Sequence, residues 1–153
     1  MRLGLLGGTF DPVHRGHLAL ARAGRDELGL DKVLFLPAGQ PWRKAGRMIA
    51  SNEHRLAMLR RALEGEAAFQ VSGLELERPG PSYTADTLEA LGDDRPEDEL
   101  FFLLGERVVW LKMPAVAVSA TEIRERVRGS QPIGDLVPAT VEEYIRKQGL
   151  YST

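Results

Sequence analysis

The sequence contains no cysteine among its 153 residues. Disulfides, thiolate nucleophiles, cysteine-bound zinc and iron–sulfur clusters are therefore excluded. It also lacks an excess of charge of either sign, because 20 Lys and Arg residues face 22 Asp and Glu residues, for a net charge of −2. A general binder of nucleic acid or of membrane surfaces is usually basic, so we expect neither partner.

Long apolar runs are missing as well. The first run, at 3–6, ends at two glycines and is too short for a signal peptide, and no later run approaches the roughly 18 apolar residues of a membrane span. With 43% hydrophobic and 27% charged residues, the composition is that of a folded chain. We therefore expect a single cytoplasmic domain over 1–153, for which a homo-oligomeric state stays open.

Short apolar runs alternate with helical patterns along the chain. Strands are expected at 3–6, 33–36, 69–76 (interrupted at Gly73) and 100–104. Helices are expected at 16–28, after Asn52 as a cap, from Ser82 as a cap to Leu91, and at 121–128 and 139–148. This alternation predicts an α/β fold, a Rossmann-like, mainly parallel sheet with helices on both faces and a helical C-terminal end.

One join does not fit such a sheet. The segments 100–104 and 108–113 both resemble strands, but only Gly105, Glu106 and Arg107 separate them. A parallel pair needs a crossover of about a dozen residues. We therefore favour a segment that is absent from the sequence near Glu106. A hairpin is the alternative, although Glu and Arg are poor residues for a tight hairpin turn.

A segment rich in glycine and histidine follows the first expected strand and opens the first expected helix. It runs Gly7-Gly8-Thr9-Phe10-Asp11-Pro12-Val13-His14-Arg15-Gly16-His17. Glycines let a phosphate approach the backbone, and a helix N-terminus supplies N–H groups. His14 and His17 face the same way and can donate hydrogen bonds to phosphoryl oxygens. Metal ligands and a helix-capping pair without a ligand are the alternatives, but a zinc site needs a third protein ligand and His54 is the only other histidine.

A second polar segment, 119–124, runs from the end of an expected strand into a helix. Ser119 and Glu122 can form a capping box, which explains both without a ligand. Arg124 is not explained in this way, and together with Ser119 and Thr121 it suits a polyphosphate.

Two further segments carry weaker signals. The basic loop 37–44, with Arg47 and Arg55 beyond it, suits the phosphate of a second substrate, or else is a solvated basic loop. The segment 80–88 presents Tyr83 and Thr84 at a helix start, where a ring and backbone groups can meet a ligand.

Together these segments resemble the nucleotidyltransferase superfamily that carries a His-x-Gly-His signature, here His14 to His17. Within it the chain resembles the bacterial nicotinate-nucleotide adenylyltransferases. The resemblance covers nearly the whole chain, at 7–17, 41–44, 82–88, 119–124 and 136–151. The chain departs from the family pattern at Trp42 and Arg43, and after Gly105, where the family has an Asp and then a Trp-containing segment.

The resemblance implies transfer of an adenylyl group from ATP to nicotinate mononucleotide, which gives nicotinate adenine dinucleotide and pyrophosphate in NAD biosynthesis. It implies Mg²⁺ on the triphosphate and no metal ligands from the protein. It assigns catalytic roles to His14, His17 and Arg124, ATP binding to Gly7, Gly8, Thr9, Phe10, Gly16, Ser119 and Thr121, and mononucleotide binding to Lys44, Tyr83 and Thr84. The alternatives are a phosphopantetheine adenylyltransferase, which the 82–84 segment disfavours, and a non-catalytic nucleotide-binding regulator, which a real deletion after Gly105 would favour.

Overall fold

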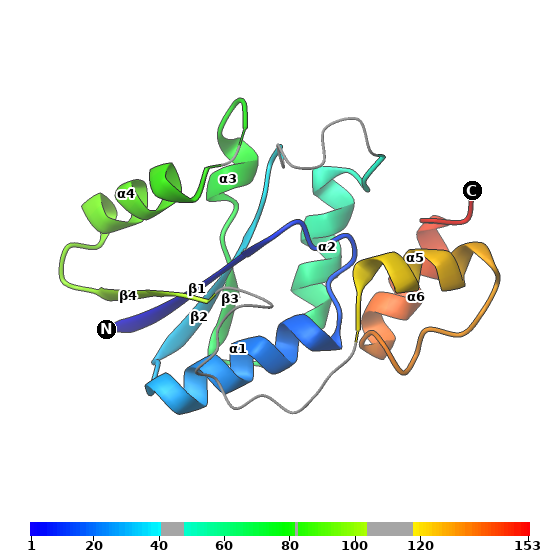
Figure 1. The fold of residues 1–153 in the computed structure, drawn as a ribbon, viewed down its shortest axis with the longest axis horizontal. Helices are drawn as coiled ribbons and strands as arrows, with labels where there is room; N and C mark the ends of the chain where they lie inside the picture. Colours follow the sequence, from blue (N-terminus) through cyan, green and yellow to red (C-terminus); the bar gives the residue numbers. More distant parts are fainter. Residues whose placement is uncertain (41–47, 82, 104–117) are drawn as a thin grey trace.

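The fold is built on a parallel sheet of four strands. The structure, a computed structural model, describes residues 1–40, 48–81, 83–103 and 118–153. The strands are β1 (Arg2–Gly8), β2 (Lys32–Pro37), β3 (Phe69–Val71) and β4 (Glu99–Phe102). They lie in the order β3-β2-β1-β4, and every neighbouring pair is parallel (Figure 1). The predicted parallel sheet is thus confirmed, whereas the strand expected at 108–113 and the join near Glu106 lie outside the described residues.

Helices cover both faces of this sheet, as predicted (Figure 1). They are α1 (Arg15–Leu28), α2 (Asn52–Ala62), α3 (Leu74–Glu77), α4 (Thr84–Asp94), α5 (Ala120–Arg128) and α6 (Ala139–Gln148). The side chains of β2 alternate between two apolar clusters: Phe35 packs in the cluster that contains α1 and α2, and Leu36 packs with Leu91 of α4. This period of two is what a strand covered on both faces requires.

The C-terminal end is helical, also as predicted. Ile123 of α5 and Ile145 of α6 are buried in the same cluster as α1 and α2, so the two last helices complete that side of the core. In the described ranges, no helix is both long enough and apolar enough to cross a membrane.

The predicted strand over 69–76 is wrong in its second half. Only Phe69–Val71 is a strand, and Leu74–Glu77 forms the short helix α3. The turn begins at Ser72, whose Oγ accepts a hydrogen bond from the Leu74 N–H at 3.3 Å. The backbone bonds of this segment are therefore satisfied locally instead of by a neighbouring strand.

Two helix starts also differ from the prediction. Ser51, and not Asn52, caps α2, since its Oγ accepts from the His54 N–H at 3.2 Å. Tyr83 occupies the N-cap position of α4, so Ser82 is not the cap. The first turn of α4 is held from its inner side instead, where Thr87 Oγ1 donates to the buried Glu75 carboxylate at 2.7 Å.

Candidate functional site

The glycine–histidine segment lies where β1 ends and α1 begins. β1 is an inner strand of the sheet, and its carboxyl end is the edge at which folds of this class bind ligands. Phe10 is only 1% exposed, and its ring lies 4.8 Å from the His17 ring, centroid to centroid. A Cβ atom on Gly8 would lie 3.1 Å from the Phe10 ring. The Phe10 side chain is therefore part of the core, and only its backbone is placed to meet a nucleotide.

The two histidines face the same way, as their spacing predicted. Their rings are stacked, with centroids 3.7 Å apart and planes at 25°. The His14 backbone N–H donates to His17 Nδ1 at 3.1 Å. Because Nδ1 accepts this bond, a neutral His17 ring carries its proton on Nε2, from which it can donate to an anionic oxygen.

His14 occupies the more buried position of the pair. His14 is 8% exposed, and this burial lowers the pKa of its ring from 6.5 to about 4. The ring is therefore neutral at pH 7. Among the described residues, His14 Nδ1 has no hydrogen-bond partner. The capping alternative accounts for both histidines, since the His14 side chain faces the His17 backbone N–H and His17 Nδ1 accepts from the His14 N–H, the two halves of a capping box. A ring nitrogen without a hydrogen bond is also compatible with a ligand contact.

Gly16 makes room for this arrangement. A Cβ atom there would lie 3.0 Å from both Cε1 and Nδ1 of His14, and 3.7 Å from the Val118 carbonyl oxygen. The start of α1 is thus close to the segment that enters α5. Two helix N-termini converge here, and each offers backbone N–H groups and a partial positive charge.

Helix α5 carries the second predicted segment to the same place. Ser119 Oγ accepts from the Glu122 N–H at 3.2 Å, which confirms Ser119 as the cap, whereas the Glu122 carboxylate accepts from Arg126. Arg124 Nη1 donates to the Asp11 carbonyl oxygen at 2.8 Å, and Nη2 donates to Thr121 Oγ1 at 3.1 Å. The fold therefore joins the first and second segments, which are far apart in the sequence.

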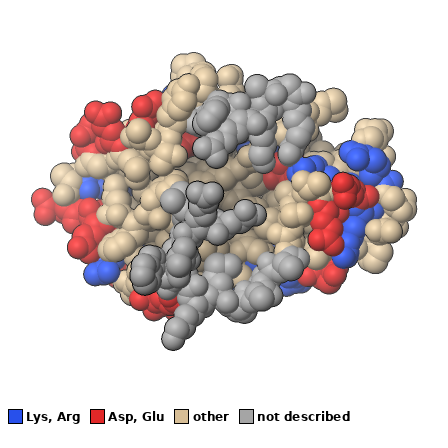
Figure 2. All heavy atoms as spheres, viewed as in Figure 1, with Lys and Arg blue, Asp and Glu red and all other residues tan. Residues whose placement is uncertain are grey.

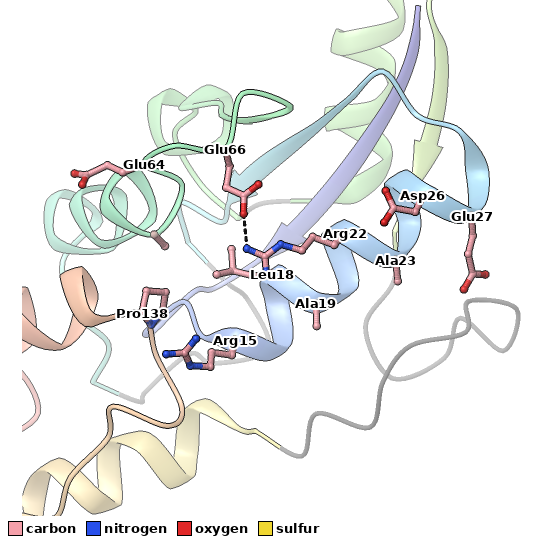
Figure 3. Close-up of a pocket in the computed structure, with 11 residues that line it drawn as sticks. Arg15, Leu18, Ala19, Arg22, Ala23, Asp26, Glu27, Glu64, Glu66 and Pro138 are labelled. Carbon is pink, nitrogen blue, oxygen red and sulfur yellow. Dashed lines mark hydrogen bonds and ion pairs between the residues drawn. The ribbon is translucent and has the colours of Figure 1, made fainter.

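A hollow of about 460 Å³ opens beside Arg124. Thr121, Arg124 and Arg128 of α5 line it, together with residues 48–50 and the C-terminal turn. A larger hollow of about 630 Å³ follows α1 (Figure 3), but none of the predicted site residues lines it. Arg22 and Glu66 form an ion pair across that larger hollow (Figure 3), so part of its charge is neutralised internally.

Arg55 does not lie in a phosphate-binding loop, contrary to one of the two sequence interpretations. Its side chain is fully buried and donates to three backbone carbonyl oxygens, those of Thr9 at 2.7 Å, Ala38 at 2.8 Å and Ala50 at 3.1 Å. Burial lowers the pKa of the Arg55 guanidinium below its usual range. Arg55 thus ties the loops after β1 and β2 to the start of α2.

Sequence reasoning did not single out Asp11 or Tyr151 as site residues. The Tyr151 hydroxyl donates to Asp11 Oδ1 at 2.6 Å, and the Ala50 N–H donates to the same oxygen at 3.0 Å. Burial and the bond to Asp11 raise the pKa of Tyr151 above its usual value, so the hydroxyl keeps its proton. Both residues lie within segments that carry the family resemblance, but no spacing rule pairs residues 140 positions apart.

Two of the three predicted mononucleotide-binding residues lie at the start of α4. Tyr83 is 50% exposed at the start of α4, and Thr84 is the first residue of that helix. Helix α4 packs on the face of the sheet opposite α1. Lys44 lies outside the described residues.

Comparison with known proteins agrees with this geometry. The cytidylyltransferase-like family model matches residues 5–126. The "Probable nicotinate-nucleotide adenylyltransferase" of Thermomicrobium roseum is 39% identical over 197 aligned residues, which cover 99% of this chain and 92% of the relative. The protein of the same name from Corynebacterium kroppenstedtii is 37% identical over 191 residues, covering 98% and 90%.

Solved structures match the fold. The nicotinic acid mononucleotide adenylyltransferase of Plasmodium falciparum, complexed with NaAD, superposes with a TM-score of 0.74 at 16% identity, covering 98% of this chain and 97% of that one. This similarity confirms the nucleotidyltransferase type of α/β fold.

The alignments to the relatives are longer than the chain itself. The first spans 197 positions against 153 residues here, so the relative has residues that this chain does not match. Their location near Glu106 stays a prediction. With the sequence identity over almost the full length and the site geometry taken together, the chain belongs to the cytidylyltransferase-like family and, within it, to the nicotinate-nucleotide adenylyltransferases.

Proposed function

We propose that this chain transfers the adenylyl group of ATP to nicotinate mononucleotide, forming nicotinate adenine dinucleotide and pyrophosphate as a step of NAD biosynthesis. One observation carries the proposal. Arg124 of α5 donates to the Asp11 carbonyl at 2.8 Å, and this contact joins an arginine to the segment that carries the stacked His14–His17 pair. These are donors of the kind that offset phosphate charge.

The chemistry asks little of the protein beyond alignment and charge. A phosphate oxygen of the mononucleotide attacks the α-phosphorus of ATP, a new P–O bond forms, and the bond to pyrophosphate breaks with its electron pair on the leaving oxygen. The attacking phosphate is already anionic at neutral pH, so no general base is needed. Catalysis then rests on holding the two phosphates in line and on stabilising the charge that moves to pyrophosphate.

The proposed contacts to ATP use the donors on these segments. His14 and His17 donate ring protons to the phosphates, and Arg124 offers a planar set of donors. Ser119 contributes through its backbone, since its hydroxyl already caps α5. The remaining proposed ATP-binding residues act through close backbone approach or a hydroxyl, and they are Gly7, Gly8, Thr9, Phe10, Gly16 and Thr121.

Magnesium enters this proposal as part of the ATP substrate. Over the ranges that the structure describes, no three His, Asp or Glu side chains are grouped so that they could hold a metal ion. The donors near the histidine pair are instead cationic or neutral, which suits the phosphate oxygens rather than the cation. When bound, Mg²⁺ neutralises part of the triphosphate charge.

The mononucleotide end of the proposal rests on Lys44, Tyr83 and Thr84. The half-exposed Tyr83 ring is available to stack on a pyridine, and Lys44 suits the phosphate.

The charge of the visible surface is mixed: acidic side chains gather around α4 and β4, while basic and acidic ones alternate over α5 and α6 (Figure 2). A cytoplasmic single domain without a nucleic-acid partner, able to form a homo-oligomer, completes the proposal.

Pyrophosphate release tests the proposal directly. We expect the purified chain to turn over ATP with nicotinate mononucleotide, and His14→Asn to slow this about 100-fold, as is typical when one stabilising donor is removed. His54→Asn is the matched control, since His54 contacts Tyr144 of α6 and should leave turnover unchanged. The intact mass, measured on the same sample, would show whether a segment near Glu106 is present.

Two outcomes would replace the proposal. Turnover with phosphopantetheine instead of nicotinate mononucleotide would favour the related adenylyltransferase. Binding of ATP without any turnover would favour a non-catalytic nucleotide binder, which the unmatched positions in the alignments to the relatives also support.

A further inference from the structure

The Asp11 carboxylate connects segments from both ends of the chain. Oδ1 accepts hydrogen bonds from the Tyr151 hydroxyl at 2.6 Å and from the Ala50 N–H at 3.0 Å. The Asp11 side chain is fully buried. A buried carboxylate needs such donors, because leaving one of its oxygens without a partner costs far more than the bond itself contributes.

The other side of Asp11 faces Arg124. Arg124 Nη1 lies 2.8 Å from the Asp11 carbonyl oxygen and 3.9 Å from Oδ2. The Arg124 side chain is 12% exposed, so solvent screens this charge pair only weakly. The direct hydrogen bonds of Arg124 go to the Asp11 carbonyl and to Thr121, and the Asp11 carboxylate adds an opposite charge 3.9 Å from the guanidinium.

Unusual backbone conformations occur at Tyr151 and next to Asp11. Phe10, next to Asp11, and Tyr151 both have positive φ values, 51° and 62°. Non-glycine residues adopt this region at a cost, and they persist there where the surroundings fix them. The structure thus holds Tyr151, and the neighbour of Asp11, in conformations that are unfavourable for an isolated chain.

We propose that Tyr151 is a positioning residue for adenylyl transfer: its hydroxyl fixes the Asp11 carboxylate, which in turn holds Arg124 in place for the triphosphate. This inference rests on the proposed function, in which Arg124 contacts ATP. The competing interpretation is that Tyr151 only fastens the turn after α6, in which case its hydroxyl contributes to stability and not to catalysis.

The test compares two tyrosine hydroxyls. Tyr151→Phe removes the donor to Asp11, and Tyr144→Phe removes a hydroxyl of α6 that contacts His54 Nδ1 at 3.0 Å, outside the proposed site. We expect Tyr151→Phe to lower kcat/KM for ATP about tenfold while KM for nicotinate mononucleotide stays unchanged. Tyr144→Phe should leave both constants unchanged. A Tyr151→Phe enzyme with the constants of Tyr144→Phe would overturn the inference.

A double-mutant cycle shows whether Tyr151 acts through Arg124. In an Arg124→Lys background, Tyr151→Phe should have little further effect, because the group that it positions is gone. Full additivity would overturn the inference. Asp11→Asn provides a second variant, which keeps an acceptor for Tyr151 but removes the negative charge near Arg124. It should lower kcat/KM for ATP at least as much as Tyr151→Phe.

A failure of the proposed function can be told apart from a failure of this inference. If the wild-type chain binds ATP but does not turn over, calorimetric ATP affinities of the same variants still decide the inference. Weaker binding by Tyr151→Phe than by Tyr144→Phe would support it, and equal binding would overturn it.

Discussion

Replacing Arg55 with methionine should destabilise the fold far more than the same change at Arg60. Both residues lie on α2, but Arg60 is exposed whereas Arg55 is fully buried. The Arg55 guanidinium donates to the carbonyl oxygens of Thr9, Ala38 and Ala50. Methionine has a similar length and no donor, so the substitution leaves those three oxygens without this partner.

The magnitude follows from these contacts. A hydrogen bond to a charged group contributes about 1.5–3 kcal/mol, and four are lost, the three to carbonyl oxygens and one to Asn52 Oδ1. Removal of the buried charge offsets several kcal/mol of this, because the guanidinium no longer has to leave water. A net loss of about 3–5 kcal/mol remains, which is a large share of the 5–15 kcal/mol typical of a domain. For a chain of this size it corresponds to a fall in Tm of roughly 10 °C.

Urea unfolding of the wild type, Arg55→Met and Arg60→Met measures this difference. Arg60→Met should stay within about 0.5 kcal/mol of the wild type, as exposed substitutions usually do. A loss below about 1 kcal/mol for Arg55→Met, together with weaker substrate binding, would refute the structural role. It would restore the interpretation of Arg55 as a phosphate-binding residue.

Two further predictions concern the histidine pair. Because the pKa of His14 is lowered from 6.5 to about 4, the folded state binds fewer protons than the unfolded chain between these values, and stability falls as the pH drops through that window. At pH 4.5 the loss in the free energy of unfolding from His14 amounts to roughly 2–3 kcal/mol. Urea unfolding at pH 7 and pH 4.5 should show this loss in the wild type but not in His14→Asn. Equal losses in the two proteins would contradict the prediction. Gly16→Ala places a Cβ atom 3.0 Å from the His14 ring, which must then shift, and it should lower kcat about tenfold. Unchanged kcat would show that the ring position does not matter.

Local sequence signals predicted much of the fold. The apolar runs in β1 and β2 and the glycine after α1 locate the first β-α-β unit, because each signal acts over a few residues. The Ser119–Glu122 cap is local in the same sense. Leu74 and Leu76 misled the prediction, since two apolar residues at alternate positions suit a strand as well as a short turn of helix.

The parts that were missed depend on tertiary contacts. Arg55 follows a basic loop in the sequence and resembles a surface residue, and only the contact of α2 with the loops after β1 and β2 shows that it is buried. Asp11 and Tyr151 are 140 positions apart, so no periodicity relates them. The roles of His14, His17 and Arg124 came from resemblance, whereas their proximity comes from the structure.

The bond between Asp11 and Tyr151 also has a consequence for the timing of folding in the cell. At about 5–20 residues per second, a ribosome adds the 140 residues between them over on the order of ten seconds. During that interval the first β-α-β unit is already synthesised and can begin to pair, but Asp11 lacks its tyrosine donor. A nascent chain therefore acquires its sheet before it acquires an ordered site, and a chain cut short before residue 151 would carry the histidine pair without the hydroxyl that orders Asp11.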